Sequence, residues 1–313
     1  MSLIDGGAIL GIELWVVLAT IGALAQTTRN ATAQTVSSRV SPTLNSWSRF
    51  AFCLPWATLA VATLAACRGW PTLDATFLGY CAIAAITQLL ANVALVTAFA
   101  RGSFGESIVF HKLEVLLTAI VGAFAFGELP TAIGTAGIAV CALGVVSINL
   151  AREGGLGGIR QAFRFGPAGG YALLCAVLLV VASFAIKLAN GAIRSADADV
   201  TFFEGAVQTL FHTTWIEVVL LSGWIAWREP ESFRAVRTLW PRMLLIGSAG
   251  FTASLCWFWS FSLTLVAYVK AVGQIEALLA VALGIRLMGE RELVRQLPGI
   301  GLTVLGIVLV LLD

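Results

Sequence analysis

The apolar stretch from 104 to 126 carries polar side chains at helical spacing. They are Ser107, His111, Glu114 and Thr118, at i, i+4, i+7 and i+11, and they therefore share one face of a helix. An ionisable side chain inside a membrane costs several kcal/mol unless it is paired or faces water. We therefore expect this face to line a cavity or a partner helix, where Glu114 can hold a proton or the ammonium group of a substrate.

A second group of polar residues lies in a later apolar stretch. Lys270 and Gln274 are one helical turn apart, and Glu276 lies about 200° round the helix from Gln274 at 100° per residue. Lys112 stands at the same angle from Glu114. These two charges point to nearly opposite faces, so they are not expected to pair with each other.

The two groups suggest a division of roles. We interpret Glu114 and Glu276 as binding a coupling proton or a substrate ammonium group. Lys112 or Lys270 would then face a substrate carboxylate. The alternative is that both acids are structural and pair with basic residues elsewhere, since charges inside a membrane also serve packing. The candidates for that role are Arg29, Arg49 and Lys187.

The apolar stretch from 201 to 225 carries a second polar face, on which Glu204 and Gln208 are one turn apart. Both are candidates to line a translocation pathway, although Glu204 is close enough to the start of the stretch to serve only the helix end. Trp257, in the stretch from 241 to 262, can stack on a planar or quaternary-ammonium substrate. Its alternative is contact with lipid.

The composition indicates that membrane-spanning helices position these side chains. Of 313 residues, 59% are hydrophobic and 12% are charged, against about 25% charged in soluble domains. Apolar stretches of about 20 residues, the length that crosses a bilayer, fill nearly the whole chain between short polar or proline-containing breaks. Ten spanning helices are expected, over residues 9–28, 43–66, 74–99, 104–126, 130–150, 167–189, 201–225, 241–262, 266–288 and 294–312.

The sequence argues against several other classes of protein. A net charge of +2 without a basic, aromatic-interleaved run indicates no nucleic-acid partner. The six cysteines follow no metal-ligand spacing, so we expect no metal site. No H-E-x-x-H, G-x-S-x-G or P-loop motif occurs, so neither catalytic residues nor a cofactor are expected. The N-terminus lacks the basic cluster of a cleaved signal, so the first helix is expected to remain in the mature protein.

An internal repeat organises the chain. Residues 99–150 align with residues 261–312 without a gap, at a constant offset of 162. The matching acids and glycines are Glu114 with Glu276, Gly122 with Gly284, Gly127-Glu128 with Gly289-Glu290, Gly137 with Gly299, and Gly144 with Gly306. Five spans per repeat is an odd number, so the second copy enters the membrane from the opposite side. We expect repeats at 1–150 and 167–313, joined by a linker at 151–166.

Each repeat contains an acid, an apolar run that ends in Gly-Glu, and a following helix with spaced glycines. This pattern, at the positions matched above, resembles the drug/metabolite transporter superfamily in its EamA-like ten-helix branch, and the resemblance covers most of the chain. The sequence departs from the family where a proline follows the acid, having Val115 and Ala277 instead. The resemblance implies an all-α integral membrane protein of ten transmembrane helices in two inverted five-helix repeats.

The resemblance also implies a function. By this resemblance the chain is expected to be a secondary active transporter of the cell (inner) membrane that works by alternating access. It is expected to export small zwitterionic or charged metabolites such as amino acids. Quaternary-ammonium compounds or drugs, nucleosides or sugars, and a non-enzymatic role in flipping lipid precursors are alternatives. The expected partners are the bilayer and a small-molecule substrate, with a coupling proton and a second copy of the chain as further candidates.

Arginine placement bears on orientation. The connections after the first, third, fifth, seventh and ninth expected spans hold eleven arginines, whereas the opposite side holds only Arg68 and Arg194. The positive-inside rule therefore places both termini outside the cytoplasm. The family resemblance implies the reverse, with both termini inside.

Overall fold

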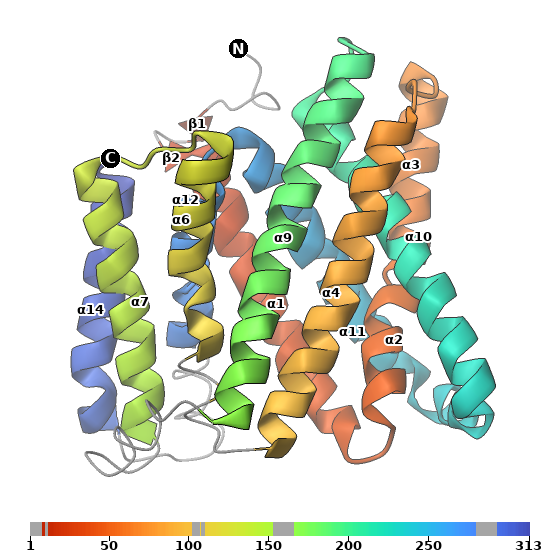
Figure 1. Cartoon of the computed structure of the whole chain (residues 1–313). Coiled ribbons are helices and arrows are strands. Elements are labelled where there is room, and N and C mark those ends of the chain that lie inside the picture. Colours follow the sequence, from red (N-terminus) through yellow and green to blue (C-terminus); the bar gives the residue numbers. More distant parts are fainter. Residues whose placement is uncertain (1–7, 10–11, 102–106, 108–109, 153–165, 280–292) are drawn as a thin grey trace. The chain divides into compact units, whose positions relative to one another are not determined.

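The computed structural model describes residues 8–9, 12–101, 107, 110–152, 166–279 and 293–313, and these residues are mostly helical (Figure 1). Contacts divide the chain into two units. Unit 1 comprises Met1–Ile86 and Ala185–Leu263, and unit 2 comprises Thr87–Phe184 and Thr264–Asp313. Each unit therefore draws on both halves of the sequence.

Unit 1 begins with a small hairpin, in which two-residue strands pair Ala8 with Glu13 and Ile9 with Ile12. Its elements are β1 (Ala8–Ile9), β2 (Ile12–Glu13), α1 (Leu14–Ser37), α2 (Pro42–Ala51), α3 (Leu54–Arg68), the start of α4 (Ala75–Arg101), the end of α9 (Pro167–Ala196), α10 (Phe202–Arg228), η2 (Pro230–Phe233) and α11 (Arg234–Leu263). A buried apolar cluster joins α1, α2, α10 and α11. It consists of Val36, Leu44, Ile225, Leu239, Met243 and Ile246.

Unit 2 contains the remainder of α4 and of α9 together with four further helices. These are α6 (Glu114–Phe126), α7 (Ala132–Arg152), α12 (Val266–Val272) and α14 (Leu293–Leu311). Ala91 and Ala94 of α4 pack with Cys175 of α9 in a second apolar cluster. This unit holds most of the predicted site residues.

Six helices are long and apolar enough to cross a membrane, counted over the residues that the structure describes. They cover Pro42–Arg68, Ala75–Ala98, Ala132–Ala151, Pro167–Ala196, Phe202–Arg228 and Pro230–Leu263, and Gln296–Leu311 is a shorter apolar helix. The prediction of a helical chain suited to a membrane is confirmed at this level. Parts of the predicted spans 9–28, 104–126 and 266–288 lie outside the described residues.

Capping chemistry explains several of the helix starts. Ser41 precedes Pro42, and its hydroxyl accepts a hydrogen bond from the backbone N–H of Leu44 at 3.2 Å. A serine N-cap followed by proline at the first helical position satisfies one backbone donor and removes another. α2 therefore begins at the Ser41-Pro42 break, as the sequence predicts.

Two predicted helix edges are wrong. The first helix was expected at 9–28, but α1 begins at Leu14 and continues to Ser37. The polar residues after 26 do not end it, because Thr27 and Thr28 donate their hydroxyls to carbonyls one turn back, at 2.8 and 3.0 Å. A second break was expected at Trp240-Pro241, yet Pro241 lies within α11, whose first residue is Arg234.

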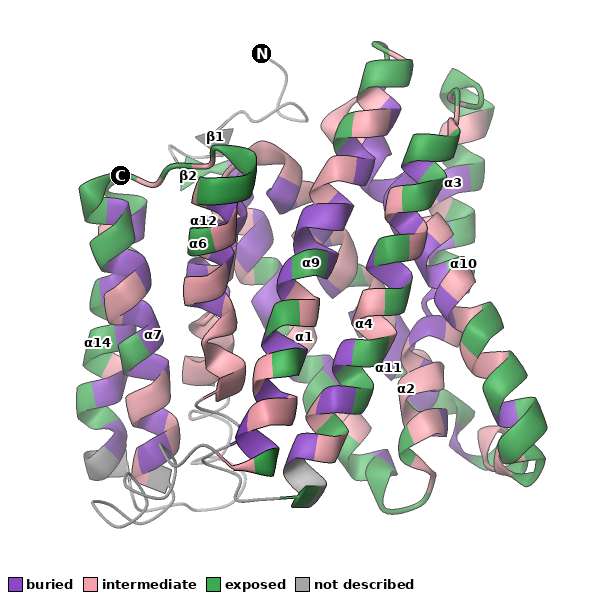
Figure 2. Ribbon diagram, viewed as in Figure 1, coloured by how far each residue is buried: buried purple, intermediate pink, exposed green. Residues whose placement is uncertain are grey.

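Many residues along the helices are exposed (Figure 2), and large apolar side chains are among them. Phe124 is 89% exposed, Leu129 73% and Val93 62%. Soluble monomers rarely expose extended apolar surface. Exposure of this kind is what a bilayer, as the solvent for the outer faces, would stabilise.

The backbones of α7 and α14 approach each other closely at glycines. A Cβ added at Gly137 would lie 2.9 Å from the carbonyl oxygen of Gly306, and one added at Gly299 would lie 2.8 Å from that of Gly144. At the offset of 162, Gly137 corresponds to Gly299 and Gly144 to Gly306, so each contact is the repeat-equivalent of the other. Small residues allow membrane helices to approach in this way.

We expect Gly306→Ala to destabilise the protein, because its Cβ would lie 2.3 Å from the backbone nitrogen of Cys141. Overpacking of this kind costs about 1–3 kcal/mol, so thermal unfolding in detergent should show a clearly lower Tm. Gly301→Ala is the matched control on α14, since no atom lies within 4 Å of its added Cβ. Equal Tm values for the two variants would contradict the close packing of α7 on α14.

Candidate functional site

The site in unit 2 lies at the start of α6 and the end of α12, and the opposite ends of these two helices are joined. Gly127 closes α6 in the left-handed conformation, with φ of 66°, and the N–H of Glu128 bonds the carbonyl of Gly122 at 2.9 Å. The helix therefore ends at a glycine in the left-handed conformation, where glycine is favoured. The Glu128 carboxylate then accepts a hydrogen bond at 3.0 Å from the backbone N–H of Val266, the first residue of α12.

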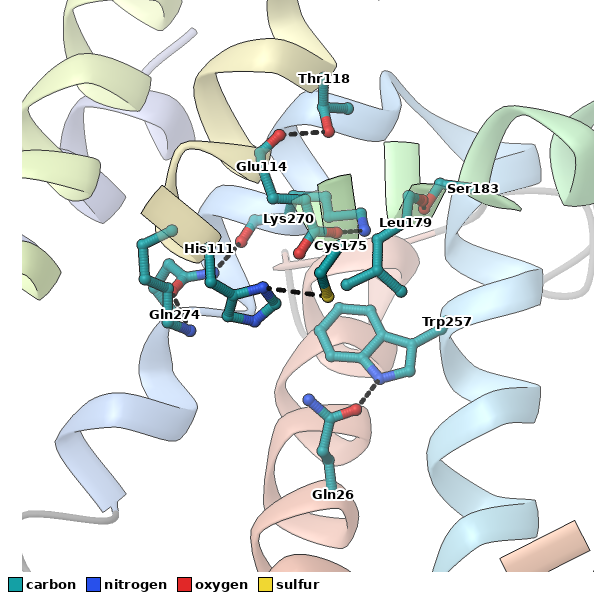
Figure 3. A network of polar contacts seen from close by, with 11 residues as sticks. Gln26, His111, Glu114, Thr118, Cys175, Leu179, Ser183, Trp257, Lys270 and Gln274 are labelled. Atoms are coloured by element: carbon teal, nitrogen blue, oxygen red, sulfur yellow. Dashed lines mark hydrogen bonds and ion pairs between the residues drawn. The ribbon is translucent and has the colours of Figure 1, made fainter. Parts of the chain in front are cut away.

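The predicted residues Glu114 and Lys270 meet as an ion pair. The Lys270 ammonium, on α12, contacts the Glu114 carboxylate at the start of α6 (Figure 3). Their side chains are only 15% and 13% exposed, so the pair is largely removed from solvent. Glu114 thus has a basic partner within its own unit.

Lys112 and Gln274 form a second contact beside the first. The Lys112 ammonium donates to the side-chain oxygen of Gln274 at 3.1 Å, and the Gln274 amide N–H donates to the backbone carbonyl of Lys270 at 3.1 Å (Figure 3). Lys112 thus contacts the residue two positions after the end of α12, while Glu114 pairs with Lys270 inside that helix. Lys112 and Gln274 are also equivalent positions at the offset of 162.

His111 lies among these charges. Its Nδ1 is 3.6 Å from the sulfur of Cys175 on α9 (Figure 3). Four charged groups act on the imidazole electrostatically, and they are Glu114, Lys112, Glu276 and Lys270. Two cations and two anions leave the group neutral overall when His111 is uncharged.

Glu276 lies in the helical residues that follow the Gly273-Gln274 turn after α12. Its backbone N–H bonds the carbonyl of Gly273 at 3.1 Å, and its side chain is partly buried. Unit 2 therefore gathers six of the nine predicted residues around α6 and α12. Sequence reasoning did not associate Cys175 with this group, because a cysteine in an apolar helix reads as packing.

Glu204 and Gln208 belong to unit 1, on the first turns of α10. The Glu204 carboxylate accepts the N–H of Thr201 at 2.8 Å, and the Thr201 hydroxyl accepts the N–H of Glu204 at 3.2 Å. This reciprocal capping box starts the helix. Its other oxygen lies 2.9 Å from Arg68, and Gln208 is 1% exposed.

Trp257 also belongs to unit 1, on α11. Its indole N–H donates to the side-chain oxygen of Gln26 on α1 at 3.2 Å (Figure 3), and its ring stacks on Phe261 with centroids 6.3 Å apart. The side chain is partly buried, so at least its polar edge is committed to a helix contact.

Glu217 is a buried acid that sequence reasoning missed. It lies in the middle of α10 and is 2% exposed, and its Oε1 has no hydrogen-bond partner. Arg49 of α2 and Glu217 act on each other electrostatically. The rule that identified Glu114, a charge inside an apolar run, would also have identified Glu217.

Metal binding has no support in the described part of the chain, where no group of three or more His, Cys, Asp or Glu side chains could hold an ion. What the site in unit 2 offers is a desolvated set of fixed charges. Such a set can bind a charged or zwitterionic solute and can exchange protons at its carboxylates.

Comparison with known proteins gives the fold and no more. No family model matches the chain, and no curated protein matches it. Among solved structures, one crystal structure described simply as that of a protein is similar, with a TM-score of 0.64 and 17% identity, over 95% of this chain and 96% of the other. The helical fold therefore occurs in a known structure.

The ion pair can be tested by a double-mutant cycle of Glu114→Gln and Lys270→Met. Each single variant leaves one buried charge unpaired and should lose about 3–5 kcal/mol of unfolding free energy. The double variant should be much more stable than the sum of the two losses predicts. Chemical unfolding in detergent supplies the measurement.

The exposed pair Arg234–Glu231, with side chains 82% and 68% exposed, serves as the control. Its cycle should give a coupling energy of at most about 1 kcal/mol. If the coupling energy between Glu114 and Lys270 were no larger than that of the control pair, the Glu114–Lys270 pair would be effectively solvated.

Proposed function

We propose that this protein is a secondary active transporter of small zwitterionic or charged metabolites, such as amino acids, and that it exports them. The observation that carries the proposal is the buried Glu114–Lys270 pair beside the Lys112–Gln274 contact. Buried charges of this kind in membrane helices mark substrate and ion pathways.

The charge balance of the site favours a zwitterion. Glu114 and Lys270 neutralise each other in the substrate-free protein. An amino acid would offer its ammonium group to the carboxylate and its carboxylate to the ammonium, so both buried charges would change partners without either being left unpaired. A solute with a single charge would leave one of them uncompensated, at a cost of several kcal/mol.

Two observations support ten spans in inverted repeats. The glycine contacts between α7 and α14 are reciprocal at the offset of 162. Lys112 and Gln274, which are equivalent at the same offset, contact each other directly. Equivalent positions touch each other where a two-fold axis passes between them, as it would between inverted repeats. Alternating access would then be a rocking of the repeats about this site.

The substrate can be identified by thermal stabilisation of the detergent-purified protein, because a ligand that binds only the folded state raises the Tm by mass action. We expect amino acids to stabilise the wild type, and Glu114→Gln and Lys270→Met to lose that effect. In proteoliposomes the same variants should reduce transport of the stabilising solute at least about tenfold, which corresponds to about 1.4 kcal/mol.

Glu231→Gln, at an exposed position outside the site, controls for general effects of removing a charge. If only sugars, nucleosides or quaternary amines raised the Tm, the proposed substrate class would be wrong, and the stabilising class would take its place. If Glu114→Gln and Glu276→Gln both left the transport rate and its pH dependence unchanged, the proposed role of the acids would be wrong.

Orientation can be tested with a native cysteine. Of the six cysteines Cys67 alone is exposed, and it lies at the end of α3 on the arginine-poor side of the predicted topology. The positive-inside rule places that side outside the cytoplasm, so a membrane-impermeant maleimide should label Cys67 in intact cells. Cys67→Ser should abolish labelling. Labelling only after permeabilisation would place the termini in the cytoplasm.

A further inference from the structure

A pocket in unit 1 lies between the end of α3 and the start of α10. Its volume is about 70 Å³, several times the roughly 10–15 Å³ that one water requires. The lining comes from α3, the segment that follows it, the α9–α10 connection and α10. The lining residues are Leu64, Arg68, Gly69, Trp70, Pro71, Asp197, Asp199, Val200, Glu204 and Gln208.

The lining carries an excess of negative charge. Three of its side chains are carboxylates, and Arg68 is its one cation. Arg68 lies 2.9 Å from Glu204, so this ion pair balances one acid and leaves the negative charges of Asp197 and Asp199. Asp197 accepts the backbone N–H of Asp199 at 3.1 Å, which holds the two acids on one turn.

Gln208 adds an observation that the acids alone do not provide. Its side chain is 1% exposed and lines the pocket, and its Oε1 has no hydrogen-bond partner. A buried acceptor without a donor costs about 1–3 kcal/mol. The acids next to the first turn of α10 could be explained by the helix dipole alone, but the dipole gives no reason for an unsatisfied amide oxygen.

We propose that this pocket binds a primary ammonium group, as carried by a small aliphatic amine. The ammonium would donate N–H bonds to Gln208 Oε1 and to the aspartates, and the ring of Trp70 offers a cation–π contact at the mouth. Among the described residues no cluster could hold a metal ion, which favours an organic cation. The site lies within unit 1, and the proposal is independent of the transport function proposed above.

Binding can be measured on the purified full-length protein by NMR titration with methylammonium at constant ionic strength. Saturable binding is expected for the wild type. Tetramethylammonium carries the same charge but no N–H donor, and it should bind at least about tenfold more weakly, since hydrogen bonds to charged groups contribute about 1.5–3 kcal/mol. Gln208→Leu should weaken methylammonium binding by a similar factor, and Asp199→Asn should weaken it several-fold.

Gln296→Leu is the matched control, because Gln296 is also buried, at 3% exposure, with an unpartnered Oε1, but lies outside the pocket. It should bind methylammonium like the wild type. If Gln208→Leu does not fold, the affinity of Asp199→Asn for methylammonium tests the proposal. Asp199 is exposed, so its substitution should leave folding intact. Absence of saturable binding to the wild type, wild-type affinity in Asp199→Asn, or equal affinity for tetramethylammonium would overturn the proposal.

Discussion

The ion pair between Glu114 and Lys270 is the interaction on which the rest of unit 2 depends. A charge removed from water is tolerated only when its partner is held in place, so both helices must be fixed before the pair can form. Gly127 ends α6, and Glu128 then caps the first N–H of α12 at Val266. Lys270 lies one turn beyond Val266, so the Gly-Glu motif also sets the helical register that brings its ammonium to Glu114.

The repeat-equivalent of this ion pair cannot form, because its lysine position holds another residue. At the offset of 162, Glu114 corresponds to Glu276, but Lys270 corresponds to Ile108, which cannot supply a cation. Both acids were kept, while the cation opposite them was not. The two copies therefore agree in backbone features, such as the glycines of α7 and α14, and differ in the charges that face the site. Under the function proposed above, this difference in charge would suit a solute whose two ends differ.

Much of this could be predicted from the sequence, and the failures have physical reasons. Periodicity and proline breaks placed both ends of α4, α7 and α10, and the starts of α2 and α9, to within a few residues, because turn chemistry is local. Pro241 was misread, since helix packing can retain a proline that local rules would place at an end. Glu114 and Lys270 were each identified as charges inside apolar stretches. Which acid pairs with which cation depends on contacts between residues far apart in the sequence, and local patterns do not reveal it. Gln208 was identified by its type and spacing, whereas its missing partner is visible only in the structure.

The difference between Lys112 and Gln274 follows from their contact with each other. Two lysines at equivalent positions would bring two ammonium groups together in surroundings with little water, and a lysine has no acceptor to offer. An amide has both a donor and an acceptor. The side chain of Gln274 uses the acceptor for Lys112 and the donor for the carbonyl of Lys270 near the end of α12. The same amide thus satisfies a backbone carbonyl near the end of the short helix α12. Because the amide carries no charge, the Lys270 ammonium pairs with Glu114. Divergence at this one position is therefore required by the contact, whatever the substrate is.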